Sequence, residues 1–156
     1  MRVKIGGIIQ NDHLARVSVL GVPHQPDTAA KLLNAFGRAG INVQFIVQCI
    51  DHNTNEHIVV CIDRNDLERA LELVRHIQGE LCASATDHAA HVASVGIFGP
   101  DFRAKPGIAA ALLAALAAAE IHIQAISTSI STVTVVIAAD QLPQAVEAIR
   151  QAFELP

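Results

Sequence analysis

The sequence predicts an α+β fold built from two small βαββαβ domains, each with a four-stranded antiparallel sheet and two helices on one face. The first observation behind this prediction is an internal repeat, in which residues 26–46 match residues 106–126 at one fixed offset. The second is that both copies show strand-like and helix-like periodicity in the same order. A repeat of this length indicates a duplicated domain and not a solenoid unit. The identical pairs are Pro26/Pro106, Ala29/Ala109, Ala30/Ala110, Leu32/Leu112, Leu33/Leu113, Ala35/Ala115, Ala39/Ala119, Ile41/Ile121, Gln44/Gln124 and Ile46/Ile126.

Composition limits the classes of protein that the chain can belong to. Its 156 residues are 51% hydrophobic, its formal net charge is −4, and it contains neither Tyr nor Trp. These values disfavour nucleic-acid binding, which needs clustered cations or aromatic stacking platforms. Three cysteines without CxxC spacing are typical of a reducing compartment, and the N-terminus lacks the apolar run of a signal peptide. The alanine-rich stretch Ile108–Ala119 is too short to cross a bilayer and indicates a buried helix. We therefore expect a soluble cytoplasmic protein that binds neither nucleic acid nor membrane.

The first copy opens with a strand and a helix. Apolar and polar residues alternate over Ala15–Val19, which predicts a half-buried strand. After a loop, Pro26 is expected to open a helix, because its missing N–H is harmless in a first turn. Gly40 is expected to end that helix. The helix itself is indicated by an apolar stripe at i, i+3, i+4 and i+7, formed by Ala29, Leu32, Leu33 and Phe36.

The rest of the first copy predicts two strands, a second helix and a last extended stretch. Ile41–Gln48 and Ile58–Ile62 are rich in β-branched and apolar residues, as strands are. Asn65 with Glu68 has the pattern of an N-cap and its acidic partner, and predicts the start of a helix there. The stretch Glu80–Thr86 is expected to be extended and to complete the unit.

The second copy repeats this order with small changes. Ala93–Phe98 is the matching first strand, and Ile121–Ser127 and Val133–Ile137 are the next two. Glu120 takes the place of the helix-ending glycine, which predicts a weaker cap. Asp140 is expected to cap the last helix, with a proline in its first turn.

The chain ends at its second copy's last helix, so that copy lacks a fourth strand, while an apolar segment, Val3–Ile9, remains unassigned at the N-terminus. A sheet without its last strand would leave unpaired backbone groups at an edge. We expect Val3–Ile9 to fill that place; the alternative is a loose N-terminal arm. The predicted domains are therefore residues 12–86, inserted, and residues 1–11 together with 87–156.

Several local motifs resemble one known family. The chain is similar to the tandem ACT domains at the C-terminal end of aspartate kinases, above all to the short beta-type regulatory subunits, and the resemblance covers essentially the whole chain. The motifs are Gly21-Val-Pro-His-Gln-Pro26, Ala39-Gly-Ile-Asn42-Val43, Ile46-Val-Gln48, Lys105-Pro106-Gly107-Ile-Ala-Ala110 and Ile126-Ser-Thr-Ser129.

The resemblance implies a ferredoxin-like fold and allosteric feedback sensing of lysine, threonine or both in aspartate-family amino-acid biosynthesis. It implies no catalysis on this chain, because the kinase's lysine- and glycine-rich motif is absent. It also suggests a catalytic kinase subunit as a partner. Unpaired edge strands and the apolar composition predict a homodimer formed through the ACT domains.

An amino-acid effector presents a carboxylate, which suits the free N–H groups at a helix N-terminus. The loop-to-helix junctions offer such groups, and Gly107 permits close backbone approach. Where the kinases usually read Asp-Lys-Pro-Gly, however, the first copy reads His24-Gln25-Pro26-Asp27, which permits a non-binding first site. The candidate effector-binding residues are His24, Asp27, Thr28, Ala29, Asn42, Val43, Gln48, Lys105, Gly107, Ile108, Ala109, His122, Ile123, Ser127 and Ser129.

Other functions remain open alternatives. The chain could be a structural assembly subunit with degenerate effector sites, or a stand-alone ACT regulator of another amino-acid pathway. An acyl-phosphate hydrolase would need an arginine in the first loop, for which Arg103 qualifies poorly. A metal would need ligands on one face, and His88 and His91 would share a face only in a helix. We expect surface histidines, no metal and no cofactor.

Overall fold

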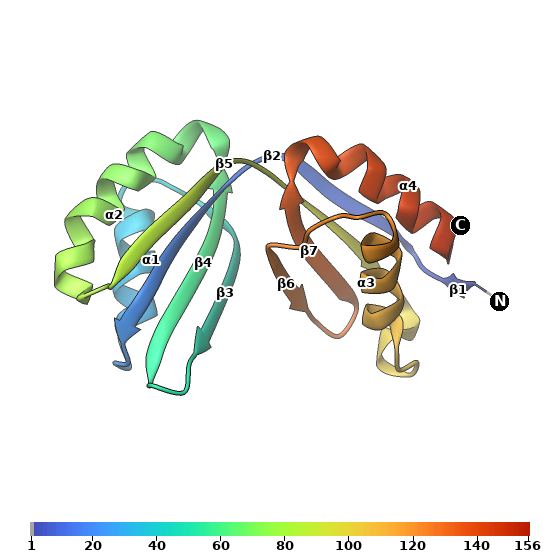
Figure 1. Cartoon of the computed structure of the whole chain (residues 1–156), viewed down its shortest axis with the longest axis horizontal. Helices are drawn as coiled ribbons and strands as arrows, with labels where there is room; N and C mark the ends of the chain where they lie inside the picture. The colour runs from blue at the N-terminus through green and yellow to red at the C-terminus, as the bar shows by residue number, and fades with distance from the viewer. Residues whose placement is uncertain (1) are drawn as a thin grey trace. The chain divides into compact units, whose positions relative to one another are not determined.

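The computed structural model describes residues 2–156, apart from the side chain of Asp101. Figure 1 shows the order of the elements along the chain. The strands are β1 (Val3–Lys4), β2 (Gly7–Pro23), β3 (Val43–Ile50), β4 (Asn55–Asp63), β5 (Ala85–Phe98), β6 (Ala125–Thr128), β7 (Thr132–Ala138) and β8 (Phe153–Glu154). The helices are α1 (Thr28–Arg38), α2 (Leu67–Leu81), α3 (Ile108–Ala118) and α4 (Leu142–Ala152), with short 3-10 turns η1 (Arg64–Asp66), η2 (Pro100–Arg103) and η3 (Ala139–Gln141).

The chain folds into two compact units. One is continuous, His13–His91, and is called here the first-repeat unit. The other, the second-repeat unit, combines Met1–Asp12 with Val92–Pro156. The long strands β2 and β5 each give residues to both units, so the first-repeat unit is an insertion between two parts of the other.

In the first-repeat unit the strand order is β3-β4-β2-β5. Strand β4 pairs antiparallel with β2 and with β3, and Val17 and Ile46 both pair with Val60 of β4. Helices α1 and α2 pack on one face of this sheet (Figure 1). The buried core between sheet and helices is Ala15, Val17, Val19, Val22, Leu32, Phe36, Ile41, Ile58, Val60, Ile62, Ala70, Val74, Ile77 and Leu81.

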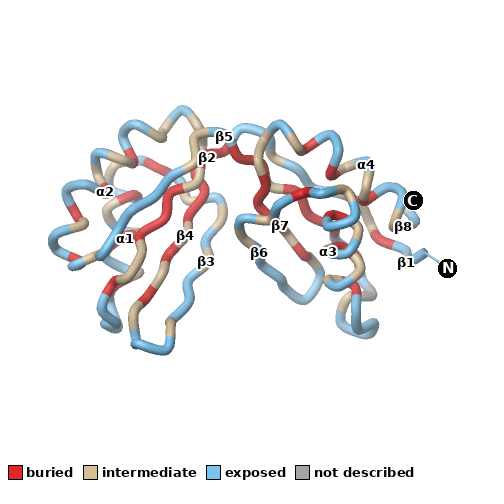
Figure 2. The backbone as a smooth tube through the Cα atoms, in the orientation of Figure 1, coloured by how far each residue is buried: buried red, intermediate tan, exposed pale blue. Residues whose placement is uncertain are grey.

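The second-repeat unit continues the order as β2-β5-β7-β6. Val95 and Ile126 pair antiparallel with Val135, as their counterparts do in the other unit. A separate parallel pair joins β1 to β8, with Val3 opposite Phe153. Figure 2 shows the buried residues of each unit gathered along its strands and the inner sides of its helices. Both units therefore have the predicted ferredoxin-like α+β architecture.

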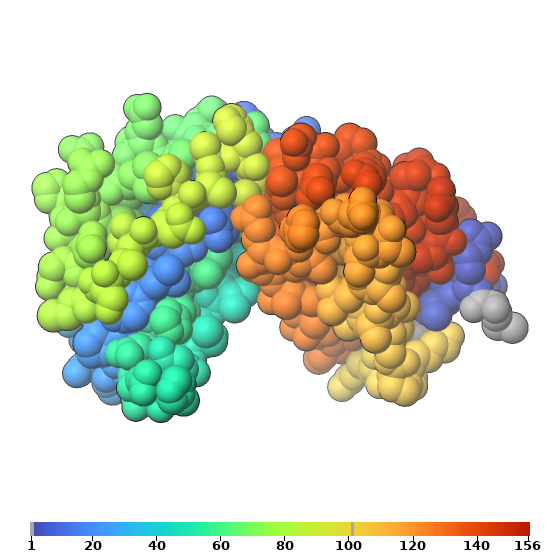
Figure 3. Space-filling model, in the orientation of Figure 1, coloured from blue at the N-terminus to red at the C-terminus, as the bar shows by residue number. Residues whose placement is uncertain are grey.

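Helix α3 differs from the prediction of a wholly buried helix. Only one stripe of it, Ile108, Leu112 and Leu116, is buried, and the outer alanines form part of the surface seen in Figure 3. Alanine explains the difference, because its small apolar side chain favours helix formation on any face. No helix among the described residues is both long and apolar enough to span a bilayer.

The helix starts also differ from prediction. Pro26 and Pro106 precede the helices, and the residues at the N-cap positions are Asp27 and Gly107. At α2, Asn65 is not the cap: its own N–H donates to Asp63 Oδ1 at 2.8 Å, which starts the turn η1 ahead of the helix. Asp140 likewise lies within η3, ahead of α4.

The helix ends show how the chain reverses. Glu80 and Leu81, expected to be extended, are the last residues of α2, and the helix ends at Cys82 with φ 55°. Glu120 adopts φ 58° after α3, matching φ 73° at Gly40 after α1. The left-handed conformation is therefore kept in the second repeat without glycine, at a cost of roughly 1–2 kcal/mol.

Candidate functional site

The first candidate loop leaves β2 through a bulge at Gly21. The β2–β4 register shifts between Val19 and Val22, and Gly21 lies between them with φ 63°. Ser84, just before β5, holds the bulge: its Oγ donates to the Gly21 carbonyl at 3.1 Å. A side chain at Gly21 would place its Cβ 2.6 Å from that Oγ, so any residue other than glycine would have to displace Ser84. The bulge sets the direction in which the chain enters the loop.

His57 joins the bulge to the β3–β4 turn. The Gly21 N–H donates to His57 Nδ1 at 3.2 Å, and His57 Nε2 lies 2.9 Å from Asp51 Oδ2. Because Nδ1 is an acceptor here, the ring proton belongs on Nε2, where it is donated to Asp51. The hydrogen bond from His57, with those from the N–H groups of Asn55 and Asn53, holds the pKa of Asp51 below its ordinary value of 3.8.

This carboxylate gives a pH dependence of stability with a defined sign. A folded-state pKa below the unfolded value means that Asp51 stabilises the fold fully above the unfolded value, and that this contribution is lost as the pH falls through the lowered value. Replacing Asp51 with Asn should therefore reduce the loss of stability below about pH 4. Urea unfolding of wild type and D51N between neutral pH and the acid range checks this; parallel pH profiles would contradict it.

Glu56 is the buried charge of the first-repeat unit. It is 2% exposed although it lies at the start of β4 beside the loop. Its carboxylate accepts hydrogen bonds from the N–H of Gln25, at 3.4 Å, and from Nε2 of Gln48. Nδ1 of His24 lies 3.5 Å from Oε1. The structure thus brings two predicted residues, His24 and Gln48, together around a third that the sequence analysis missed.

The position of Glu56 in the alternating pattern of its strand could have identified it from the sequence. Successive side chains of a strand alternate between faces, so Glu56 falls on the same face as Ile58, Val60 and Ile62, which are all core residues. A glutamate in phase with a buried apolar series needs hydrogen-bonding partners close by.

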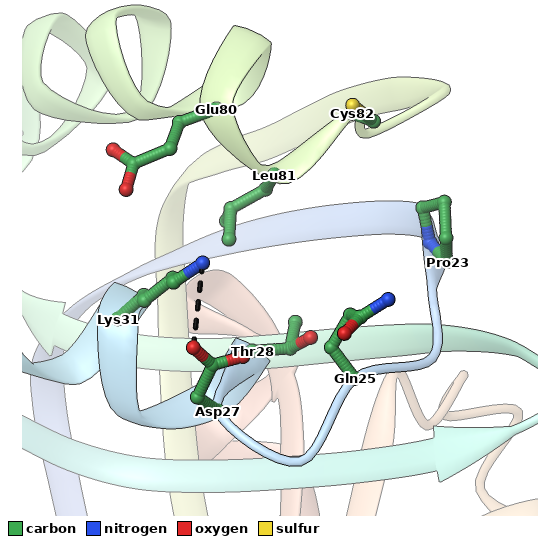
Figure 4. A pocket seen from close by; sticks show the side chains of 8 residues that line it. All are labelled: Pro23, Gln25, Asp27, Thr28, Lys31, Glu80, Leu81 and Cys82. Carbon is green, nitrogen blue, oxygen red and sulfur yellow. Dashed lines mark ion pairs between the residues drawn. The ribbon is translucent and has the colours of Figure 1, made fainter.

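The start of α1 borders a cavity of about 260 Å³. Two predicted residues, Asp27 and Thr28, line it, facing the end of α2 (Figure 4). Asp27 pairs with Lys31 one turn along, at 3.4 Å, and Thr28 is 2% exposed with its N–H donated to the Gln25 carbonyl. Ala29 packs against the core from a partly buried position. This helix start therefore carries its own carboxylate, and its first N–H is already donated within the loop.

The second candidate loop is more open. Lys105 and Gly107 are exposed, Ile108 is buried as the first residue of α3, and Ala109 packs partly buried against the core. Gly107 has φ 91°, and nothing lies within 4 Å of where its Cβ would be. The glycine thus leaves free space directly before an eleven-residue helix.

Two predicted serines lie at the sheet end from which this loop starts. Ser127 is exposed in β6, and the N–H of Ser129 donates to the Thr132 carbonyl at 2.8 Å in the turn that follows. The N–H of Gly99, which begins the loop, donates to the Ser131 carbonyl at 3.0 Å. These bonds place the serine-rich turn beside the beginning of the loop.

Four predicted residues lie elsewhere in their own units. Asn42 and Val43 follow the C-terminal end of α1, and His122 and Ile123 follow that of α3. An eleven-residue helix is roughly 16 Å long, so each pair is separated by a helix length from the loop that precedes that helix. Within one unit, the candidate residues therefore form two groups at opposite helix ends.

The cysteines and histidines that the structure describes lie apart from one another or have other partners. Burial raises the pKa of the Cys61 thiol to about 12, which makes it unreactive. Exposed Cys49 pairs with His57 across the ladder, but both ring nitrogens of His57 are already engaged. His88 and His91 lie in strand β5, where a spacing of three puts them on opposite faces. Among the described residues no group of three metal-ligating side chains is gathered.

Comparisons with known proteins agree on one family. The ACT domain family matches residues 17–77 and 95–153. Aspartate kinase from Stutzerimonas stutzeri (strain A1501) is 36% identical over 151 residues, which are 97% of this chain and 37% of the kinase. The chain therefore spans little more than a third of that relative.

Two solved structures are similar over nearly their full length. The regulatory subunit of aspartate kinase from Thermus flavus has a TM-score of 0.88 and 26% identity, with 97% of this chain and 99% of that chain covered. A chain in the crystal structure of aspartokinase alpha and beta subunits has a TM-score of 0.86 and 30% identity, with 95% and 97% covered.

Proposed function

Because this chain belongs to the ACT domain family and forms a tandem ACT regulatory region of the aspartate kinase type, we propose that it senses an amino-acid effector, lysine or threonine, and regulates a kinase catalytic centre located outside residues 1–156. The observation that carries this proposal is the second loop. The exposed Gly107 directly before α3, with open space beside it, leaves the first N–H groups of the helix within reach of a ligand carboxylate.

The regulation is a coupling between sites. An effector that binds one arrangement of the regulatory region more tightly than another shifts the population toward it, by no more than the difference in binding free energy. The residues at the far helix ends, Asn42 and Val43 with His122 and Ile123, would then meet an effector only through a second copy of the chain. A homodimer formed through the edge strands β3 and β6 suits this requirement.

Ligand titration tests the proposal on the whole chain. Lysine or threonine at about one hundred times its Kd should stabilise the fold by about 2.7 kcal/mol. Lysinamide and threoninamide, which lack the carboxylate, are the matched controls and should give no stabilisation. Thermal unfolding that none of the twenty amino acids shifts would leave a structural assembly subunit as the better description.

A further inference from the structure

We propose that Glu56 is a built-in substitute for an effector carboxylate, so that the first repeat holds its ligand position filled from within and the second repeat carries the sensing. The inference rests on the proposed function in taking the effector's carboxylate to lie at the loop before a helix. It adds that the ligand position of the second repeat is the available one, and that Glu56 occupies the position in the first repeat.

The contacts of Glu56 are those expected of a bound ligand carboxylate. One oxygen, Oε2, accepts from the Gln25 N–H of the loop, while Oε1 accepts from Gln48 and faces His24 Nδ1 at 3.5 Å. Main-chain N–H, side-chain amide and imidazole are the donors that a carboxylate ligand would need. Two of these donors are hydrogen-bonded to Glu56 and the His24 imidazole faces it, so they are engaged before a ligand arrives.

The fold holds Glu56 firmly in this position. In the two ladders of β4 it lies opposite Val22 on one side and Ile50 on the other. At 2% exposure its side chain leaves no path for solvent, and a second carboxylate would meet its charge. The N-cap residue Asp27 adds another negative charge at the helix start, 3.4 Å from Lys31.

The second repeat lacks this device. Its ladder register, with Val95 opposite Val135 as Val17 is opposite Val60, aligns Ser131 with Glu56. The fixed offset of the sequence repeat, which matches Pro26 with Pro106, places Gly107 at the position of Asp27. Neither acidic residue has an acidic counterpart in the second repeat.

A competing interpretation is that Glu56 binds the ammonium group of an effector. It is the weaker one, since the carboxylate already has two hydrogen-bond donors, faces an imidazole nitrogen at 3.5 Å and has almost no exposed surface. The two interpretations predict opposite effects of removing the side chain: a carboxylate site is created in the first case, and an ammonium site is lost in the second.

The test uses acetate as a carboxylate probe. In E56A the donors remain and the space is vacated, so about 100 mM acetate should raise the Tm of E56A by about 3 °C more than chloride does. Wild type, E56Q, which refills the space, and S131A, altered at the matched position of the second repeat, share any acetate response of the second repeat and should lack this additional stabilisation. An equal acetate response of E56A and wild type would overturn the inference.

Calorimetric titration with lysine and threonine measures how many equivalents of amino acid each chain binds. One equivalent for wild type and two for E56A are expected; two for wild type, or loss of binding in E56A, would overturn the inference. If wild type binds neither amino acid while acetate still stabilises E56A, the proposed function fails and the role of Glu56 stands. Should E56A not fold, the Gln25 amide resonance decides, because it should shift in E56Q if its acceptor is this carboxylate and stay in place if it is not.

Discussion

Replacing Gly21 with Ala should destabilise the first-repeat unit by about 3 kcal/mol. A left-handed conformation costs an alanine roughly 1–2 kcal/mol, and overpacking commonly costs 1–3 kcal/mol more. Both apply here, since Gly21 has φ 63° and its Cβ would lie 2.6 Å from Ser84 Oγ and 2.8 Å from Ser84 Cβ. The Ser84 side chain cannot move away without losing its hydrogen bond to the Gly21 carbonyl.

Two other glycines of the same unit separate these causes. Gly40 has φ 73° but open space around it, so G40A should cost only about 1 kcal/mol. Gly37 also has open space and lies within α1, where G37A should stabilise by about 0.5–1 kcal/mol. Urea unfolding of the full chain, followed through NMR signals of β4, measures all three. Equal losses for G21A and G40A would show that the contact with Ser84 is unimportant.

Replacing Gly107 with Asp should lower lysine or threonine affinity about tenfold to a hundredfold, or 1.4–2.8 kcal/mol. Two like charges about 4 Å apart near a protein surface interact by roughly 4 kcal/mol, so an introduced carboxylate opposes a ligand carboxylate strongly. The new side chain has room, because nothing lies within 4 Å of its Cβ, but φ 91° at this position should cost stability roughly 1–2 kcal/mol. The variant gives the second repeat the residue that the first repeat already has, Asp27.

The neutral variant G107N is the control. It has nearly the same shape and capping oxygen as G107D, and it tolerates a positive φ. Its affinity should therefore fall much less, when both variants are compared by calorimetry at one ionic strength. If G107D and G107N bind equally well, the effector carboxylate does not lie at this helix start.

The architecture was predictable because it depends on periodic apolar positions. The repeated stripe that includes Leu32 and Phe36 indicated α1, and both residues are buried in the core. The resemblance to the aspartate kinase regulatory region was likewise confirmed by the family match. Helix ends were less predictable, because Asp63 and Asn65 are both good capping residues and only the course of the chain decides between them.

The site was predictable in its loops but not in its contacts. Gly107 could be singled out because the chemistry of a loop before a helix depends on local sequence. Glu56 could not be connected with Gln25, which lies 31 residues earlier, because only the sheet register brings them together. The same holds for the bond between Gly21 and His57, separated by 36 residues.

The course of the chain has a consequence for biosynthesis. The continuous unit, His13–His91, can fold as soon as it leaves the ribosome, since domains form during synthesis as their residues emerge. The other unit must wait for the last residues, because Val3 pairs with Phe153. A product truncated within α4 would therefore keep every residue of the first-repeat unit but lose the β1–β8 pair.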